Sequence, residues 1–564
     1  MIKFLKSNLF FLIILASLTF IVYGKSINYE FTGIDDDALT SKKSLYISNI
    51  KNFPKFFLTD CYHNKKVTQY YRPILSLSFA IETILFGINT KIYHLTNIIL
   101  FILALYLMYL FLCKFTLNKN ILKFVLLLFC IHPIFVSSVV WLPARNDTLL
   151  AIFIFLFFIT FINYIRENKK VYFFFSSVFF TIALFTKETT VIVFIIMFLL
   201  IYCFDLKITK KQVLNYLLVF ITVLAAYFIL RKFAVDSIHF NHYIKYFYEY
   251  LTNTFYGTML YVKYIFIVED IPIMLNFLKF DIVSFIISVF SIFLLLCLYI
   301  FKIINRKIIV FNILLFVLFL LPSFAQEYYT WLSHRFIISS VSIIFIFTEI
   351  INKLISKYVF IKKYIFSLLC VLIISFGFSS WLQADKYKNS KVFWLTAYKN
   401  SPNSHVTMNS LADVYIENKE YDKAKDLILK TLQIRSSVEY YLKLTTVEYL
   451  INNDLELAEK NYFQCLEHAG TYYKASILAR LSEIYYLKKD LKKAIEYAEK
   501  SLELQPYDKH TLLYLANYYA LDKQFSKARP IYERLLKDDN ENEYYQYLIK
   551  TLDEDEKENV TDKS

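Results

Sequence analysis

Long apolar stretches separated by short charged turns occupy the first two thirds of the chain. Eleven stretches are long enough for a helix to cross a bilayer. They lie at about 8–23, 94–115, 121–141, 148–165, 171–186, 189–205, 213–230, 281–301, 308–325, 337–352 and 364–381. For the first stretch a cleavable signal peptide is the alternative, but the ten stretches behind it favour an uncleaved span. The pattern predicts an all-α, polytopic membrane domain over residues 1–382.

The basic residues between these stretches indicate an orientation. With a cytoplasmic N-terminus, the inner loops hold 18 Lys and Arg residues and the short outer loops hold three, Arg145, Lys187 and Arg335. A further stretch, 252–268, carries Lys263 and is either a twelfth span or a membrane-surface helix. A full crossing there would invert the later loops and remove the charge bias. We therefore expect eleven spans, with the C-terminal part of the chain outside the cytoplasm.

From about residue 400 the pattern changes to charged, amphipathic helices. Alanines recur at 34-, 36- and 34-residue spacing, and a tyrosine precedes each by nine positions: Tyr415 and Ala424, Tyr449 and Ala458, Tyr485 and Ala494, Tyr519 and Ala528. This period is typical of tetratricopeptide (TPR) repeats. It predicts about four helix pairs over 400–550, stacked into a solenoid that binds a peptide or protein. Residues 551–564 form an acidic tail, and the part after Asp553 is expected to be disordered.

Composition and charge narrow the functional classes. The 564-residue chain is 57% hydrophobic and has a net charge of +15. Its basic residues form short runs between apolar stretches rather than one patch, which argues against nucleic-acid binding. The seven cysteines show no CxxC motif and no paired spacing, so neither a disulfide framework nor a zinc site is expected.

Two predicted outer loops, 24–93 and 231–280, are long, and long ordered loops are usually functional. The first contains Asp35, Asp36 and Asp37 just past a span. A solvated loop is the ordinary interpretation of such a cluster; the functional one is a general base or a metal site, because crowded carboxylates raise one another's pKa. Arg72 follows, either to pair with a lipid phosphate or as a snorkelling residue. The run after it, Ile74 to Gly87, is expected to lie on the membrane surface.

Further ionisable residues stand at the span ends on the same predicted outer side. They are His132, Arg145, Asp147, Lys187, Glu188, His334 and Arg335. Each is weak evidence alone, and Lys187-Glu188 is readily explained as an adjacent ion pair. Their common side indicates a shared site.

The order of these motifs resembles the transmembrane-and-TPR glycosyltransferases, relatives of the protein O-mannosyltransferases and of the lipid A aminoarabinose transferases. The most specific part runs from Tyr70-Tyr71-Arg72-Pro73 through Phe86-Gly87-Ile88-Asn89 to Tyr93-His94-Leu95-Thr96-Asn97. The second is His132-Pro133 through Trp141 to Arg145-Asn146-Asp147. Lys187-Glu188 and the C-terminal repeats complete the likeness, which covers nearly the whole chain.

The resemblance implies a GT-C fold with its active site in the outer loops and a polyprenyl-phosphate sugar as donor. Asp35 or Asp36 is similar to the family's catalytic carboxylate, and Asp147 to a second acidic residue facing the acceptor or a metal. Arg72 is similar to the residue that neutralises the leaving phosphate, with Lys187 and Arg335 adding positive charge. The further candidates are Asp37, His94, His132, Arg145 and Glu188. The need for a divalent metal stays open.

The chain departs from the family pattern at two places. Where the family commonly has His-Pro-x-His-x-Glu, this chain has Phe135 and Ser137, and where the last outer turn usually has Asp-Arg-Tyr it has His334-Arg335-Phe336. The leading interpretation is a membrane glycosyltransferase, with mannose as one candidate sugar and a protein or glycan as acceptor. A non-catalytic TPR scaffold for an envelope complex is the alternative. A transporter or glycan ligase is the weakest, because the spans are nearly charge-free and Gly-poor. The membrane would be the cell membrane in a bacterium, which we favour, or the endoplasmic reticulum in a eukaryote.

Overall fold

The computed structural model describes residues 8–33, 35–41, 44–63, 68–116, 118–235, 247–276, 280–324, 330–358, 361–538 and 542–561. The chain divides into two compact units. The first, here called the apolar unit, comprises Met1–Thr32, Lys55–Ser78 and Thr90–Asn400. The second, the repeat unit, comprises Gly33–Pro54, Phe79–Asn89 and Ser401–Ser564.

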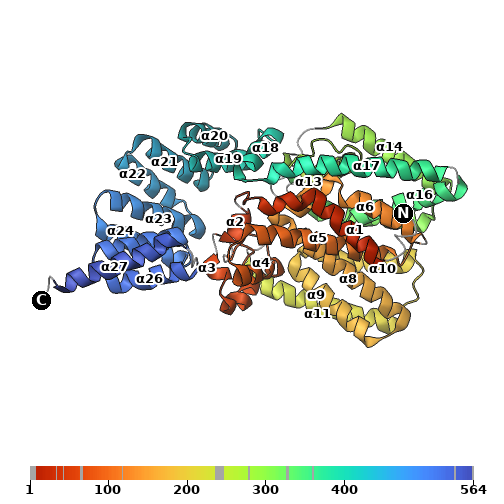
Figure 1. Cartoon of the computed structure of the whole chain (residues 1–564), viewed down its shortest axis with the longest axis horizontal. Coiled ribbons are helices and arrows are strands. Elements are labelled where there is room, and N and C mark those ends of the chain that lie inside the picture. Colours follow the sequence, from red (N-terminus) through yellow and green to blue (C-terminus); the bar gives the residue numbers. More distant parts are fainter. Residues whose placement is uncertain are drawn as a thin grey trace. The chain divides into compact units, whose positions relative to one another are not determined.

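Each of the eleven apolar stretches forms helix in the apolar unit (Figure 1). The helices are α1 (Asn8–Tyr23), α5 (Thr90–Leu112), α6 (Lys119–Cys130) with α7 (Val136–Val140), α8 (Arg145–Glu167), α9 (Lys170–Thr186), α10 (Val193–Cys203), α11 (Lys210–Ala234), α14 (Ile282–Ile300), α15 (Arg306–Phe324), α16 (Ser340–Lys357) and α17 (Ile361–Ala384). The prediction of a helical fold is confirmed.

Fewer of these helices meet the length and hydropathy of a membrane span. Within the described residues six segments do so: Asn8–Asn28, Thr90–Leu112, Leu142–Glu167, Lys210–Ala234, Ile282–Ile300 and Ser367–Tyr387. The pair Lys119–Cys130 and Pro133–Val140, bent by 60°, makes a seventh if it is one span. The chain therefore has several helices suited to a membrane, while the expected number of eleven is supported for only six or seven.

Further elements lie between these helices along the chain. They are η2 (Gly24–Asn28), η4 (Ile50–Leu58), α4 (Pro73–Phe86), η5 (Pro133–Phe135), η6 (Leu142–Ala144), η7 (Glu188–Ile192), α13 (Phe247–Phe266), β1 (Leu275–Asn276), β2 (Thr330–Trp331), η8 (Ser333–Phe336), η9 (Asp385–Tyr387) and α18 (Ser390–Asn400). The stretch 252–268 falls on α13, which is not among the six candidate spans. Strands β1 and β2 pair antiparallel, with Leu275 opposite Trp331, and are the only strands in the described part of the chain.

The core of the apolar unit lies around α5, α6 and α8. The side chains of these helices are mostly buried, and α1 and α17 pack beside them (Figure 1). In contrast, α11 and α14 carry large exposed apolar side chains, such as Ile221 and Phe293. An exposed apolar surface of this extent is suited to association with a membrane.

The repeat unit is built from antiparallel helix pairs, coloured blue-green to blue in Figure 1. Its helices are α2 (Asp35–Leu39), α3 (Ser44–Ile47), α19 (His405–Glu417), α20 (Tyr421–Ile434), α21 (Val438–Asn452), α22 (Leu455–Glu467), α23 (Thr471–Leu487), α24 (Leu491–Leu504), α25 (Lys509–Leu521), α26 (Phe525–Asp538) and α27 (Glu543–Thr561). The alanines at 424, 458, 494 and 528 are all buried on the second helix of a pair, where only a small side chain lets the paired helices approach. The four predicted helix pairs are present.

The C-terminal tail does not follow its prediction. Helix α27 runs from Glu543 to Thr561, so most of the segment expected to be disordered is helical. Its first half packs on α26: Leu552 is buried and Arg529 pairs with Asp553. These contacts with α26 stabilise α27, and the acidic composition alone does not reveal them.

Candidate functional site

The charged candidates of the apolar unit stand where helices begin or end. Arg72 directly precedes α4, and Asp147 is the third residue of α8. Lys187 directly follows α9, and His334 and Arg335 lie in η8. Segments far apart in the sequence thus each contribute one or two ionisable side chains. We call these five residues and Glu188, the first residue of η7, the charge cluster.

Local sequence explains where Asp147 sits. Pro143 lies within η6, just before α8, where a residue without an N–H group is tolerated because the first amides of a helix have no intrahelical acceptor. A carboxylate in the first turn is favoured by the positive end of the helix dipole. Both features favour Asp147 at the start of α8. Its side chain is nevertheless buried, with 8% of its surface exposed.

Asp147 and Lys187 form the centre of the cluster. Lys187 Nζ donates a hydrogen bond to Asp147 Oδ1 at 2.7 Å, and both side chains are buried. Burial lowers the pKa of Lys187, with Arg72 and Arg335 adding to the effect, while Asp147 acts in the opposite direction. A buried pair of this kind is expensive to break, because the remaining charge would be left without a partner.

His334 lies beside this pair as a neutral ring. Its Nε2 is 3.7 Å from Asp147 Oδ2, and its Nδ1 is 3.4 Å from the hydroxyl of Ser137. Burial lowers the pKa of His334 to about 3 against the opposing effect of Asp147, and Arg335 and Lys187 lower it further. At neutral pH the contact with Asp147 is therefore not an ion pair.

Neighbouring aromatic residues hold η8 in position. The Tyr261 hydroxyl donates to the backbone oxygen of Leu332 at 2.6 Å. Trp331, which is fully buried in β2, packs against Tyr261 and Tyr264 of α13 at ring distances of 4.9 and 5.2 Å. Helix α13 thus supports the turn that carries His334.

Arg72 is the least satisfied member of the cluster. Its Nη2 is 3.9 Å from Glu188 Oε1, and the Glu188 side chain is 44% exposed, so this ion pair is loose. The Nε of Arg72 is buried and has no hydrogen-bond partner among the described residues. Burial opposes the charged form, but Glu188 and other groups raise the pKa of Arg72, which stays positive. A buried donor without an acceptor is costly, and the oxygen of a ligand can supply the acceptor.

The charges of the cluster do not cancel. Arg72, Lys187 and Arg335 are positive, Asp147 and Glu188 are negative, and His334 is neutral, which leaves one surplus positive charge. Guanidinium and ammonium groups are the usual partners of phosphate oxygens. The arrangement suits a phosphate-bearing ligand.

The three aspartates of the first loop belong to the repeat unit. Asp35, Asp36 and Asp37 open α2. Asp36 is buried, with Oδ1 accepting from the Asp37 amide at 3.2 Å, and its backbone oxygen accepts from Thr40. Asp37 Oδ1 accepts from the Ser41 hydroxyl at 3.1 Å. Participation of Asp36 in one site with the charge cluster stays a prediction.

Two of the remaining candidates are engaged by the helix scaffold. Arg145 donates to Asn97 Oδ1 at 2.7 Å and to the backbone oxygen of Tyr93 at 2.9 Å, which ties α8 to α5. His132 Nδ1 accepts from the Ile134 amide, so its Nε2 is the nitrogen that donates, to the Ile265 oxygen at 3.1 Å. These bonds hold the frame of the unit rather than the charge cluster.

His94 is also buried within the helix packing. It lies on α5, and its ring meets the edge of the Tyr29 ring at 6.2 Å. The structure therefore places His94 against an aromatic neighbour in the interior of the apolar unit.

The structure also shows positioning contacts that sequence reasoning missed. Trp394 donates to the backbone oxygen of Thr32 at 2.9 Å, and Trp141 donates to the Thr32 hydroxyl at 3.1 Å. Thr32 is only four residues before Asp36 in the sequence. No spacing rule links these tryptophans, 109 and 362 residues away, to that threonine.

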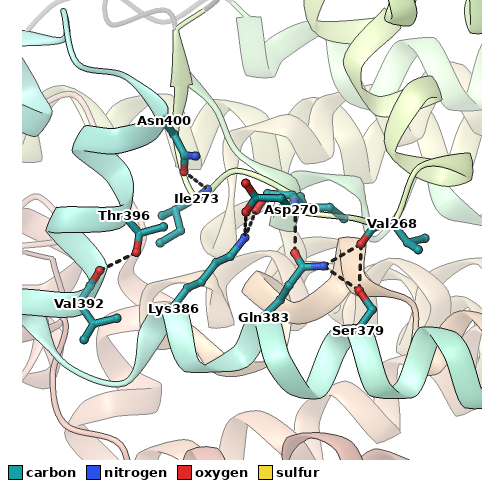
Figure 2. A network of polar contacts seen from close by, with 10 residues as sticks. Val268, Asp270, Ile273, Ser379, Gln383, Lys386, Val392, Thr396 and Asn400 are labelled. Atoms are coloured by element: carbon teal, nitrogen blue, oxygen red, sulfur yellow. Dashed lines mark hydrogen bonds and ion pairs between the residues drawn. The ribbon is translucent and has the colours of Figure 1, made fainter.

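A second network fastens the chain after α13 to α17 and α18 (Figure 2). Gln383 donates to the Val268 oxygen at 2.8 Å and accepts from the Ile271 amide at 3.0 Å. Lys386 Nζ is 2.8 Å from Asp270 Oδ1, and this hydrogen bond lowers the pKa of Asp270. Part of the second long loop is thereby ordered.

The departures from the family pattern contact one another. Ser137 lies 3.4 Å from His334, and the ring of Phe135 lies 6.0 Å from that of Phe336. The four positions that differ are therefore two adjacent pairs, one polar and uncharged and one aromatic. In the described part of the chain, no three His, Cys, Asp or Glu residues gather closely enough to hold a metal ion.

Comparison with known proteins supports the repeats most directly. The tetratricopeptide repeat model matches residues 485–552. This part of the chain consists of TPR repeats. Solved structures with similar regions are YrrB, described as a TPR protein with an unusual peptide-binding site (14% identity, 28% of this chain and 81% of that one, TM-score 0.22), and MamA (18%, 29% and 88%, TM-score 0.21).

Two curated relatives match parts of the chain. Protein O-mannosyl-transferase TMTC1 of Mus musculus is 30% identical over 204 residues, which are 32% of this chain and 21% of that protein. Anaphase-promoting complex subunit CDC16 of Saccharomyces cerevisiae is 27% identical over 142 residues, 24% and 16% of the two chains. The chain spans about a fifth of the length of these relatives, so the likeness to a mannosyltransferase is partial.

Proposed function

We propose that this protein is an integral-membrane glycosyltransferase of the GT-C type that moves a sugar from a polyprenyl-phosphate donor to a protein or glycan acceptor. The observation that carries the proposal is the charge cluster, with its surplus positive charge and an Arg72 Nε that has no hydrogen-bond partner among the described residues. The partial similarity to an O-mannosyltransferase points the same way.

Each residue has a role in the proposed reaction. Asp36, or its neighbour Asp35, takes the proton of the acceptor hydroxyl while that oxygen forms a bond to the anomeric carbon. The bond from this carbon to the phosphate oxygen breaks with inversion, and its electron pair leaves with the phosphate. Arg72, Lys187 and Arg335 stabilise the charge on that phosphate. Asp147 orients Lys187 and holds it in the charged form.

An apolar cavity offers room for part of the polyprenyl chain. It has a volume of about 400 Å³ and lies between α13, α14, α15 and α16, with Phe255, Leu295 and Phe316 in its walls. Its nearly complete lack of polar surface suits an isoprenoid chain.

The proposed topology has eleven spans, a cytoplasmic N-terminus and the TPR repeats outside the cytoplasm. This topology requires shorter apolar helices, such as α9 and α10, to cross the membrane as well. The membrane domain covers residues 1–382, and the repeats over 400–550 recruit the acceptor or a partner protein, which is the usual work of such solenoids.

Sugar transfer by the purified full-length protein tests the proposal. Radiolabelled polyprenyl-phosphate sugars are offered with peptide and glycan acceptors. Arg72→Ala removes a stabilising charge from the leaving group, so transfer is expected to fall by about 10²–10³-fold. Asp36→Asn removes the base and is expected to cost about 10²–10⁴-fold.

Matched controls use the same residue types away from the charge cluster. Arg166→Ala and Asp205→Asn change exposed side chains and should leave transfer within about twofold. Unchanged transfer in Arg72→Ala and Asp36→Asn would show that these residues do not carry the reaction.

The alternative is a non-catalytic TPR scaffold. The contacts that favour it are Ser137 with His334 and Phe135 with Phe336, uncharged pairs at positions where the family pattern has two acidic groups. Native protein that transfers no sugar from any donor, yet binds a partner through its repeats, would establish the scaffold.

A further inference from the structure

A second polar region of the apolar unit lies at the other end of α8. Here a pocket of about 700 Å³ opens between the start of α1, the end of α5, the start of α6 and α8. Its polar walls are formed by Lys114, Lys119, Lys123, Asn8, Asn118 and Asn120. Asn163, which binds one of these lysines, is 16 residues beyond Asp147 on α8, about 24 Å along the helix.

Three lysines meet in this pocket. Lys114 Nζ donates to Asn163 Oδ1 at 2.8 Å. Lys123 is 2% exposed, and its Nζ lies over the Tyr109 ring at 5.3 Å from the ring centre. Lys119 is the first residue of α6 and is exposed. No Asp or Glu lines the pocket among the described residues.

This concentration of positive charge is unfavourable without a counter-ion. Burial lowers the pKa of Lys114, and the nearby charges of Arg166 and Lys119 lower it further, while Glu167 acts in the opposite direction. The start of α6 adds the positive end of a helix dipole. An anion in the pocket would offset all of these charges at once.

We propose that this pocket binds the phosphate of an anionic phospholipid head group. It lies at the ends of three segments suited to cross a membrane, those of α1, α5 and α8, which is the depth of the head groups. Basic pockets between membrane helices commonly take such lipids. Asn8 and Asn120 carry amide donors for the remaining phosphate and glycerol oxygens, while the amide of Asn118 already donates to Asn352 Oδ1 at 3.0 Å. The pocket binds lipid whether or not the charge cluster transfers sugar.

Binding of a fluorescent phosphatidylglycerol by the full-length protein in neutral detergent tests the site. Each lysine near the anion is expected to contribute about fivefold in affinity, so the triple variant of Lys114, Lys119 and Lys123→Gln should bind about a hundredfold more weakly. The matched control is the triple variant Lys207, Lys210 and Lys211→Gln, which removes three exposed lysines near the start of α11 and should bind as the native protein does.

A single exposed change guards against misfolding, because Lys119→Glu alters a solvent-facing side chain and should still weaken binding at least tenfold. Unlabelled phosphatidylglycerol should displace the probe, while phosphatidylcholine and millimolar inorganic phosphate should not. Equal binding by the two triple variants would overturn the site. Displacement by inorganic phosphate as effective as that by phosphatidylglycerol would identify a free anion as the ligand and overturn the lipid assignment.

Discussion

Lysines lie near both ends of α8, but they differ in whether a carboxylate pairs with them. At one end Lys187 is held by Asp147 at 2.7 Å, and a second carboxylate, Glu188, faces Arg72. At the other end Lys114, Lys119 and Lys123 line one pocket whose described wall residues include no carboxylate. At the first end a carboxylate of the protein neutralises the lysine. At the second end an ion or lipid from the surroundings would have to do so. Buried charges should therefore support stability at the first end and oppose it at the second.

Breaking the first arrangement should have the largest effect. Asp147→Asn leaves Lys187 buried beside an uncharged amide, and we expect a loss of about 3–5 kcal/mol in the free energy of unfolding. The melting temperature of the purified protein in detergent measures it. Asp205→Asn removes an acid from an exposed pair with Lys307 and should cost at most about 1 kcal/mol.

A double variant separates pairing from packing. Asp147→Asn with Lys187→Met removes both charges and keeps similar volumes, so it should be clearly more stable than Asp147→Asn alone. A double variant as unstable as the single one would mean that side-chain shape, not the ion pair, holds this end together.

Sequence reasoning reached the helical frame because its signals are periodic. The apolar stretches mark every helix around the core of the apolar unit, and the 34-residue repeat marks the helix pairs with their buried alanines, such as Ala424 and Ala494. It expected eleven spans, whereas six or seven segments of the described residues have the length and hydropathy of one. An apolar stretch such as 171–186 shows its composition but not whether its helix is long enough to cross alone.

The candidate site was accessible only in part. Residue types at span ends pointed to Asp147, Lys187 and Arg72, but their partners depend on how helices distant in sequence pack. Nothing in the sequence predicts that Lys187 bonds Asp147 rather than its neighbour Glu188, or that Ser137 meets His334 from 197 residues away. Local pattern therefore identified the charges, and tertiary packing decided their pairing.

The second end should respond in the opposite direction and more weakly. Lys119→Gln removes one of three like charges at a helix start, and we expect a gain of about 0.3–1 kcal/mol in the free energy of unfolding in neutral detergent. Lys210→Gln, also an exposed lysine at a helix start, is the matched control for the dipole effect. A greater gain for Lys119 than for Lys210 isolates the repulsion within the pocket, and a loss on replacing Lys119 would contradict the comparison.

The smallest effect should appear in the pH dependence of stability. The pKa of Lys114 is lowered in the folded protein by burial and by the neighbouring cations, against the opposing effect of Glu167. The unfolded chain therefore binds more protons between the folded pKa and the usual value near 10.5. Stability from this group therefore rises as pH increases through that window, the reverse of an ion-paired lysine.

Melting temperatures from pH 7 to 10 should climb less in Lys114→Gln than in the native protein. Added phosphatidylglycerol should flatten the native curve toward that of the variant, because an anion beside Lys114 returns its pKa toward the unfolded value. Identical curves for the native protein and Lys114→Gln, with or without lipid, would show that the charge of Lys114 does not destabilise the folded protein. The contrast with the Asp147–Lys187 end would then not hold.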